Sequence, residues 1–300
     1  MTDQQLVGGI EFGGTKTIMA VGDRNGHILN HECMPTGAPS SLVRSIGDYF
    51  AKQTALLGPV SAIGAGAFGP VVIDRRAPDF GHLLQTNKPG WSGFGLHSAL
   101  SAATGHDVEL VTDVGAAAIG EAMKGALRDT ALGVYLTVGT GIGGAIICGG
   151  RPLPAMLHPE LGHLPMKRPV GDDWPSTCAF HDDCAEGLAA GPAIAGRFGQ
   201  PLNAFDSGSP QVELVADYLG QLCASLTLTL SPHRIVVGGG VAKAPGLLQL
   251  TGKAMRRHLN GYAVKGTEDP AFICAPALGD QAGIVGALLA ASISANFVER

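Results

Sequence analysis

Four side chains of the kinds that bind metals stand close together near the middle of the sequence. Cys178, His181 and Cys184 form a Cys-x2-His-x2-Cys pattern, and His163 precedes Cys178 by fourteen intervening residues. Two thiolates and two imidazoles complete a tetrahedral zinc set without a water ligand. The alternatives are a disulfide between Cys178 and Cys184, or histidines that are only surface polar groups. Because four such ligands rarely coincide at this spacing, the pattern favours a closed structural zinc site.

Two carboxylates flank these four residues. Glu160 precedes His163 by three positions, and Glu186 follows Cys184 by two. Both could be solvated surface charges, but an intact zinc site would hold both in fixed positions. A rigid pair of hydrogen-bond acceptors suits a polyhydroxylated ligand, because its hydroxyl groups are donors.

Two glycine-rich turns offer backbone N–H groups to an anion, since glycine lets phosphate oxygens approach the main chain. The first, "GGTK", consists of Gly13, Gly14, Thr15 and Lys16, and the second, "GTGIGG", contains Gly139, Thr140, Gly141, Gly143 and Gly144. Neither fits the P-loop pattern or a dinucleotide-binding fingerprint that opens a helix. Each turn alone is typical of a structural hairpin. As a pair they favour a nucleotide bound between two similar domains.

Asp113 stands where a short strand is expected to run directly into an alanine-rich helix, in "VELVTDVGAAAIGEAMKGAL". A carboxylate at such a junction is a good helix cap, so a structural role is one interpretation. A catalytic carboxylate is the other. The residue pattern alone does not decide between them.

The composition is that of a globular protein with a sizeable core. The chain has 300 residues and a net charge of −5, and its 45 glycines follow no G-x-y period. No Lys/Arg run is present, so nucleic acid is not expected as a partner. Without a signal pattern or a stretch of about 18 apolar residues, the sequence predicts a soluble cytoplasmic protein with no membrane partner. In a reducing compartment, its cysteines would be core thiols plus one metal site.

The organisation of the sequence repeats at domain scale. Each glycine-rich turn lies between two apolar strands, and helical patterns follow, for example from Ser40 and from Gln211. The runs "VSAIGAGAFGPV" and "HRIVVGGGVA" are typical of buried parallel strands that end at a site. Two similar α/β halves facing one another are expected. The smaller domain would span 1–117, with a C-terminal helix over about 285–300 packing back on it, and the larger would span 118–284 with a zinc-binding loop over 158–187.

Five motifs in order carry a family resemblance: "EFGGTK", "TDVGAAAIGE", "TVGTGIGGA", "HPELGH" with the Cys/His cluster after it, and "VVGGGV". Together they span nearly the whole chain, and they resemble the ROK family of sugar kinases, most closely its bacterial fructokinase branch. The resemblance implies an actin-like, hexokinase-like (ribonuclease H-like) ATPase fold. In that fold, two α/β domains close over a cleft in which ATP and sugar meet.

The resemblance also implies roles for individual residues. It places the ATP phosphates on Gly13, Gly14, Thr15, Lys16, Thr140, Gly141 and Gly143, and the adenosine side on Gly239 and Gly240. It makes Asp113 the general base that takes the proton of the attacking sugar hydroxyl. The sugar contacts would be Gly69, Thr112, Asp113, Glu160, His163 and Glu186. A structural Zn²⁺ on His163, Cys178, His181 and Cys184 would rigidify the loop that presents these groups, and Mg²⁺ would bridge the β- and γ-phosphates.

The implied activity is ATP-dependent phosphorylation of D-fructose to D-fructose 6-phosphate by a cytoplasmic homodimer. A kinase for another hexose, such as mannose, glucose or an N-acetylhexosamine, is the nearest alternative. A non-catalytic sugar-binding protein is a second. A sugar-responsive repressor of this family would carry a helix-turn-helix domain ahead of the first hairpin, where only about eight residues stand.

The sequence departs from the common family pattern at a few positions. Glu11 replaces an Asp before "GGTK", Thr112 replaces an Asn before the expected base, and the metal set has two histidines instead of one. These three departures also resemble the fructokinase branch. Gly115 stands where many relatives have Asn, so one polar contact at the expected active site is absent. "AFGPV" around Gly69 and "TNKPGW" over 86–91 are expected to form walls of the sugar pocket.

Overall fold

The computed structural model describes residues 5–86, 88–263 and 265–295. The chain divides into two compact units: the first contains Met1–Lys124, Pro152–His158 and Asp280–Arg300, and the second contains Gly125–Arg151 and Pro159–Gly279. The sequence predicts a domain boundary after residue 117, which lies inside helix α3 (Asp113–Lys124). In the structure, all of α3 belongs to the first unit. In the described ranges, no helix is both long and apolar enough to span a membrane.

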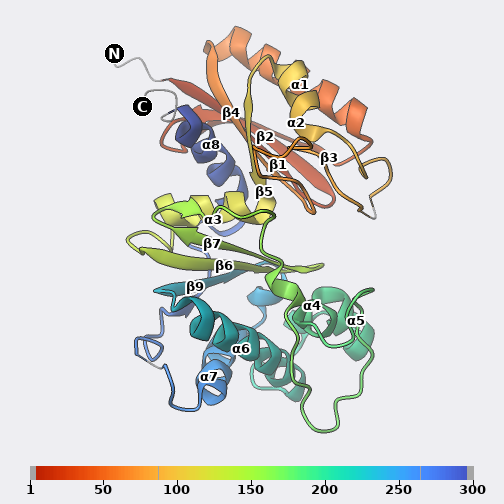
Figure 1. Ribbon diagram of the computed structural model, residues 1–300, viewed down its shortest axis with the longest axis vertical. Coiled ribbons are helices and arrows are strands. Elements are labelled where there is room, and N and C mark those ends of the chain that lie inside the picture. The colour runs from red at the N-terminus through yellow and green to blue at the C-terminus, as the bar shows by residue number, and fades with distance from the viewer. Residues whose placement is uncertain (1–4, 87, 264, 296–300) are drawn as a thin grey trace. The chain divides into compact units, whose positions relative to one another are not determined.

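The first unit contains a five-stranded sheet in the order β3-β2-β1-β4-β5 (Figure 1). Its strands are β1 (Leu6–Phe12), β2 (Lys16–Asp23), β3 (Ile28–Pro35), β4 (Val60–Ala67) and β5 (Val108–Thr112). Strand β1 is antiparallel to β2 and parallel to β4, which is in turn parallel to β5. The predicted hairpin and buried parallel strand are therefore confirmed.

Helices cover both faces of this sheet: α1 (Pro39–Leu57), α2 (Leu96–Thr104), α3 and α8 (Ala282–Ala295). A Cβ added at Gly8 would meet Phe50 of α1, and one added at the next residue, Gly9, would meet Leu288 of α8. Successive residues of a strand point to opposite faces, so α1 and α8 lie on opposite faces of the sheet. Helix α8 also packs closely on α3, because a Cβ at Gly286 would overlap the carbonyl oxygen of Ala116.

The second unit repeats this topology, with its sheet in the order β8-β7-β6-β9-β10. Its strands are β6 (Leu132–Val138), β7 (Ile142–Cys148), β8 (Arg151–Pro152), β9 (Arg234–Gly238) and β10 (Ile273–Cys274). Strand β6 is antiparallel to β7 and parallel to β9, as β1 is to β2 and β4. The expectation of two similar α/β halves is confirmed by this match.

Helices α6 (Pro210–Leu230) and α7 (Leu247–Leu259) pack on one another and contribute to the main core of the second unit. Two shorter helices follow the Cys/His segment, α4 (Ala185–Ala189) and α5 (Gly191–Phe198). Single 3₁₀ turns occur at η1 (Leu161–His163), η2 (Leu202–Ala204), η3 (Val241–Lys243) and η4 (Gly279–Gln281). The helix predicted from Gln211 is α6, and the one predicted from Ser40 is α1.

The second glycine-rich turn is shorter than the sequence suggests. Strand β7 begins at Ile142, and Gly143 pairs with Thr137 and Gly144 with Leu136 in the sheet. The turn is therefore Gly139–Thr140–Gly141, and the expectation that Gly143 and Gly144 belong to it is wrong. The physical reason is packing, because a Cβ at Gly144 would come 2.5 Å from Leu161 Cδ1 of η1. Glycine in this strand lets η1 lie close to the sheet.

A partly buried carboxylate, that of Glu11, stands near the carboxyl end of β1 in the first unit. A Cβ at Gly283, near the start of α8, would come 2.5 Å from the Glu11 carboxyl carbon. Glu11 Oε2 is buried and has no hydrogen-bond partner among the described residues. Burial, reinforced by the negative charge of Asp113 and only partly offset by Lys16, raises the pKa of Glu11 from 4.5 to about 7.

This raised pKa predicts a pH-dependent stability. Because the folded pKa exceeds the ordinary value, the contribution of Glu11 to stability is complete below about pH 4.5 and is lost as the pH rises through about 7. The loss is of the order of 3 kcal/mol, at about 1.4 kcal/mol per pKa unit. We therefore expect Glu11→Gln to reduce the fall in the free energy of unfolding between about pH 5 and 8 in the ligand-free protein. Equilibrium denaturation across this range measures it.

The matched control is Glu32→Gln, which removes an exposed carboxylate from β3 in the same unit. In this variant, the free energy of unfolding should change with pH as it does in the wild type. Equal slopes for the wild type and Glu11→Gln would mean that Glu11 titrates normally in the folded protein.

Candidate functional site

Several predicted site residues lie at one edge of the first sheet. Ala67 at the end of β4 pairs with Thr112 at the end of β5, and both strands run parallel to β1. Parallel strands end at the same edge, so the turn after β1, Gly69 and Asp113 share it. Gly69 also lies against the ring of His158, since a Cβ there would come 3.0 Å from its Nε2.

Thr112 caps helix α3, so Asp113 is not needed for that task. The Thr112 hydroxyl accepts a hydrogen bond from Gly115 N at 2.9 Å, which is the bond that an N-cap side chain makes. Asp113 Oδ1 accepts from the adjacent Val114 N at 2.8 Å. The Asp113 carboxylate therefore stands in the first turn of the helix, where the helix dipole favours a negative charge.

The "GGTK" turn is clamped from one side and exposed on the other. Gly13 N donates to Lys16 O at 2.9 Å, which closes the turn between β1 and β2. Thr36 holds it, because its N donates to Thr15 O at 2.9 Å and its hydroxyl donates to Gly13 O at 3.0 Å. Gly14, Thr15 and Lys16 are exposed. These three residues can therefore present backbone, hydroxyl and ammonium donors to an anion.

The second turn is held by a carboxylate. Ile142 N donates to Glu186 Oε2 at 2.8 Å, and Gly139 N closes the turn by donating to Gly141 O at 2.9 Å. A Cβ at Gly141 would come 2.5 Å from the same Glu186 oxygen, while Thr140 is exposed at the tip. Glu186, which the resemblance assigns to the sugar, is thus a structural partner of the expected phosphate turn.

Two glycines that the resemblance assigns to the adenosine side, Gly239 and Gly240, directly follow strand β9. Gly239 has a φ of +91°, and a Cβ there would overlap the Val138 carbonyl at the end of β6. Gly240 is exposed and precedes η3. The ends of the parallel strands β6 and β9 therefore lie side by side next to the second turn, which follows β6 directly.

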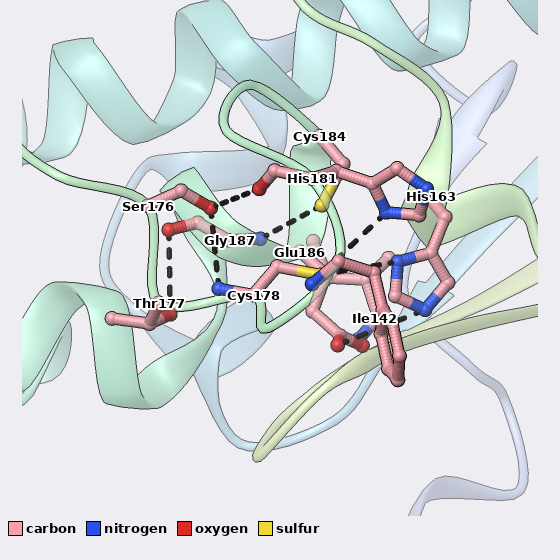
Figure 2. A network of polar contacts seen from close by, with 10 residues as sticks. Ile142, His163, Ser176, Thr177, Cys178, His181, Cys184, Glu186 and Gly187 are labelled. Atoms are coloured by element: carbon pink, nitrogen blue, oxygen red, sulfur yellow. Dashed lines mark hydrogen bonds and ion pairs between the residues drawn. The ribbon is translucent and has the colours of Figure 1, made fainter.

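The structure brings the four predicted metal ligands together in the second unit (Figure 2). One ligand atom from each of His163, Cys178, His181 and Cys184 lies within 4.8 Å of the others. Cys178 Sγ is 3.7 Å from His163 Nδ1 and 3.6 Å from His181 Nδ1. Ideal tetrahedral bonds of about 2.3 Å to sulfur and 2.0–2.1 Å to nitrogen would separate S and N by about 3.6 Å. Cys178 and Cys184 are not bridged, so the disulfide alternative is not supported.

Short backbone and side-chain contacts position these ligands. Ser176 Oγ donates to His181 O at 2.7 Å and accepts from Cys178 N at 3.2 Å, which fixes the turn between the two ligands (Figure 2). Cys184 caps helix α4, because its Sγ accepts from Gly187 N at 3.4 Å. Burial raises the pKa of the Cys184 thiol to about 11. A bound metal would therefore have to displace a proton from this sulfur.

His163 connects the metal ligands to the carboxylate of the second turn. Its Nδ1 faces Cys178, while its Nε2 lies 3.9 Å from Glu186 Oε1 (Figure 2). His163 N donates to Glu160 O at 3.0 Å, so Glu160 begins the short η1 turn, and its side chain is exposed. Of the two carboxylates predicted to flank the cluster, Glu186 therefore contacts it directly, and Glu160 is tied to it through the backbone.

A buried ionic network, which the sequence pattern does not reveal, holds the middle of the loop over 158–187. Asp172 pairs with Arg197 of α5 and accepts a hydrogen bond from Tyr218 of α6. The side chains of Asp172 and Arg197 are only 5% and 11% exposed. Arg168 donates to the carbonyl of Trp174 at 2.6 Å. These residues come from separate elements, so no local spacing in the sequence could have revealed the network.

Known proteins resemble this chain in sequence over nearly its whole length. It is 36% identical over 286 residues to a fructokinase of Pediococcus pentosaceus, covering 95% of this chain and 97% of that protein. It is also 36% identical over 298 residues to a fructokinase of Zymomonas mobilis subsp. mobilis, covering 98% and 99%.

Solved structures agree with the fold. The ROK hexokinase from Thermus thermophilus matches with a TM-score of 0.82 and 31% identity, over 98% of this chain and 100% of that one. A ROK family glucokinase from Streptomyces griseus, solved with glucose and AMPPNP, matches with a TM-score of 0.71 and 27% identity, over 96% and 98%. The actin-like, hexokinase-like ATPase fold is thereby confirmed. The ROK family itself matches residues 7–293, and the chain belongs to this family.

Proposed function

We propose that the protein is an ATP-dependent hexose kinase that converts D-fructose to D-fructose 6-phosphate. The observation that carries the proposal is the edge of the first sheet, where Asp113 stands in the first turn of α3 and the exposed "GGTK" turn follows β1. A carboxylate and a set of anion-binding donors at one edge are the parts that phosphoryl transfer to a hydroxyl needs. Near full-length similarity to two fructokinases supports fructose as the acceptor.

The two glycine-rich turns are proposed to hold the phosphates of ATP. Gly14, Thr15 and Lys16 offer exposed donors in the first unit, and Thr140 does so in the second. Glu11 lies close enough to Asp113 and Lys16 for their charges to shift its pKa, and its buried Oε2 has no described partner. These carboxylates suit a hydrated Mg²⁺, which would neutralise the charge of the β- and γ-phosphates when bound.

Asp113 is proposed as the general base. It would accept the proton of the 6-hydroxyl as that oxygen forms a bond to the γ-phosphorus and the bond from phosphorus to the leaving ADP oxygen breaks. Thr112, Gly69, Glu160, His163 and Glu186 remain the proposed sugar contacts. Glu186 would act partly through the second turn, because its Oε2 is already used by Ile142 N.

The four converged ligands are proposed to bind a structural Zn²⁺. Two thiols and two imidazoles form a closed set, and these softer ligands favour zinc over Mg²⁺ or Ca²⁺. Zinc would fix His163 and, through the short step from Cys184 to α4, would fix Glu186. Its role would be positional, since no ligand position is left for substrate.

A kinase for another hexose is the second candidate. The specific observation in its favour is the fold match to a ROK glucokinase solved with glucose, although identity there is only 27%. The reaction and its residues would be the same. The difference would lie in which sugar hydroxyls find partners, because a buried polar group left unpaired discriminates strongly against the wrong isomer.

Asp113→Asn tests the general base. The amide cannot accept the proton, so kcat should fall by about 10²–10⁴-fold while the fold and ATP binding remain. Steady-state kinetics, with thermal melting as a check on folding, measures this. Asp129→Asn, which alters a carboxylate with an 85% exposed side chain, is the control and should behave like the wild type. Near-normal turnover in Asp113→Asn would remove this residue from the mechanism.

Cys184→Ser tests the metal centre. Metal analysis of the purified wild type should find about one zinc per chain. The substitution should remove this zinc, because a closed site that loses one of its thiolate ligands loses most of its affinity for the metal. The KM for fructose should rise as the loop over 158–187 loosens. Cys148→Ser changes an exposed cysteine outside the site and serves as the control. Zinc-free wild-type protein with full activity would contradict the proposal.

A sugar panel tests specificity. At saturating Mg-ATP, kcat/KM should be highest for fructose, and mannose is the expected second substrate, with glucose and N-acetylmannosamine below them. If glucose or N-acetylmannosamine exceeds fructose by tenfold, about 1.4 kcal/mol, the fructokinase assignment fails and the hexose kinase assignment stands. Absence of turnover with every sugar would leave a non-catalytic sugar-binding protein.

A further inference from the structure

A lysine of the "TNKPGW" segment, which the sequence assigns to a wall of the sugar pocket, reaches the tip of the first glycine-rich turn. Lys88 Nζ donates to Gly14 O at 2.5 Å and lies 4.7 Å from the centroid of the Phe68 ring. A Cβ added at Gly14 would come 3.6 Å from the same nitrogen. The ammonium group of Lys88 therefore stands directly beside the turn whose exposed residues are proposed to bind phosphate.

Contacts on both sides of Lys88 hold the segment that carries it. Ser92 closes the segment that carries it, because its Oγ accepts from Thr86 N and donates to Thr86 O, both at 3.0 Å. Trp91 anchors the segment, since its side chain is 2% exposed and its Nε1 donates to Gly37 O at 3.0 Å. The Trp91 ring also meets Phe12 and Phe68 edge-on, with centroids 6.1 and 5.2 Å apart.

The charge of Lys88 is not matched by an anion. Among the residues that the structure describes, it makes no ion pair with a carboxylate, and its two partners are a neutral carbonyl and an aromatic ring. A second cation, Lys16, ends the same turn. The ammonium group of Lys88 beside the exposed turn, together with the cationic residue that ends it, favours an anion with several oxygens.

We infer that Lys88 is a further phosphate-binding residue, which exchanges its hydrogen bond to Gly14 O for an oxygen of the phosphoryl group that is transferred. The inference rests on the proposed function, in which the "GGTK" turn holds the phosphates of ATP. Four rotatable bonds allow the ammonium group to move without any change in the backbone. Lys88 neither gains nor loses a proton in the step. It stabilises the negative charge on the phosphoryl oxygens while the bond to the sugar oxygen forms and the bond to ADP breaks.

Two substitutions separate this role from a structural tie between Lys88 and Gly14. Lys88→Gln keeps a donor for the Gly14 carbonyl but removes the charge, and Lys88→Arg keeps the charge. If the charge acts on phosphate, Lys88→Gln should lower kcat by about 10²-fold with little change in melting temperature or in the KM for the sugar. Lys88→Arg should retain activity within about tenfold of the wild type. Lys52→Gln, at an exposed site on α1, is the matched control and should not differ from the wild type.

The inference is overturned if Lys88→Gln has the kcat of the wild type. It is also overturned if Gln and Arg variants lose activity equally and melt at lower temperature, because that result identifies a structural tie. Calorimetric binding of Mg-AMPPNP gives a readout that does not depend on sugar turnover. If the wild type phosphorylates no sugar, the proposed function fails, but tenfold weaker Mg-AMPPNP binding by Lys88→Gln would still support the phosphate contact. Equal binding by the wild type and the variant would then reject it.

Discussion

The hydrogen bond between Ile142 N and Glu186 Oε2 is the contact on which the second half of the site depends. It joins a turn proposed to bind phosphate to helix α4, whose N-cap residue, Cys184, is a proposed metal ligand. The other oxygen of the same carboxylate faces His163 Nε2 at 3.9 Å. The Glu186 side chain therefore links the turn, the Cys/His cluster and η1. A change at any of the three alters the environment of the other two.

This coupling changes how substitutions in the turn should be interpreted. A side chain at Gly141 would collide with Glu186, since a Cβ at this position would come 2.5 Å from Oε2. Because Glu186 Oε2 is the end of a flexible side chain, it could move, but the movement would disturb the hydrogen bond to Ile142 and the approach to His163. Effects on nucleotide and on sugar are consequently not separable at this position, although sequence reasoning assigns the turn to the nucleotide alone.

The sequence predicts those features of the fold and the site that depend on local patterns, but not those that depend on contacts between distant segments. The Cys/His spacing, the two hairpins and the Asp113 junction are local, and the structure places each of them as expected. The sequence pattern predicts Gly143 and Gly144 in the turn, because glycine composition cannot distinguish a turn from a strand in which glycine makes room for Leu161. The contact of Lys88 with Gly14 and the ion pair of Asp172 with Arg197 join residues that are far apart in the sequence, so no local pattern predicts them.

The departures from the family pattern beside Asp113 are physically linked. Thr112 caps α3 by accepting from Gly115 N, and a Cβ at residue 115 would come 2.8 Å from the Thr112 hydroxyl oxygen. A residue larger than glycine at 115 would therefore push against the cap that Thr112 provides. Thr112 and Gly115 are best regarded as one feature, in which a β-branched cap is accommodated by the absence of a side chain three residues later. The polar contact that an Asn at 115 could supply is given up, and the Thr112 hydroxyl remains free to cap the helix that carries Asp113.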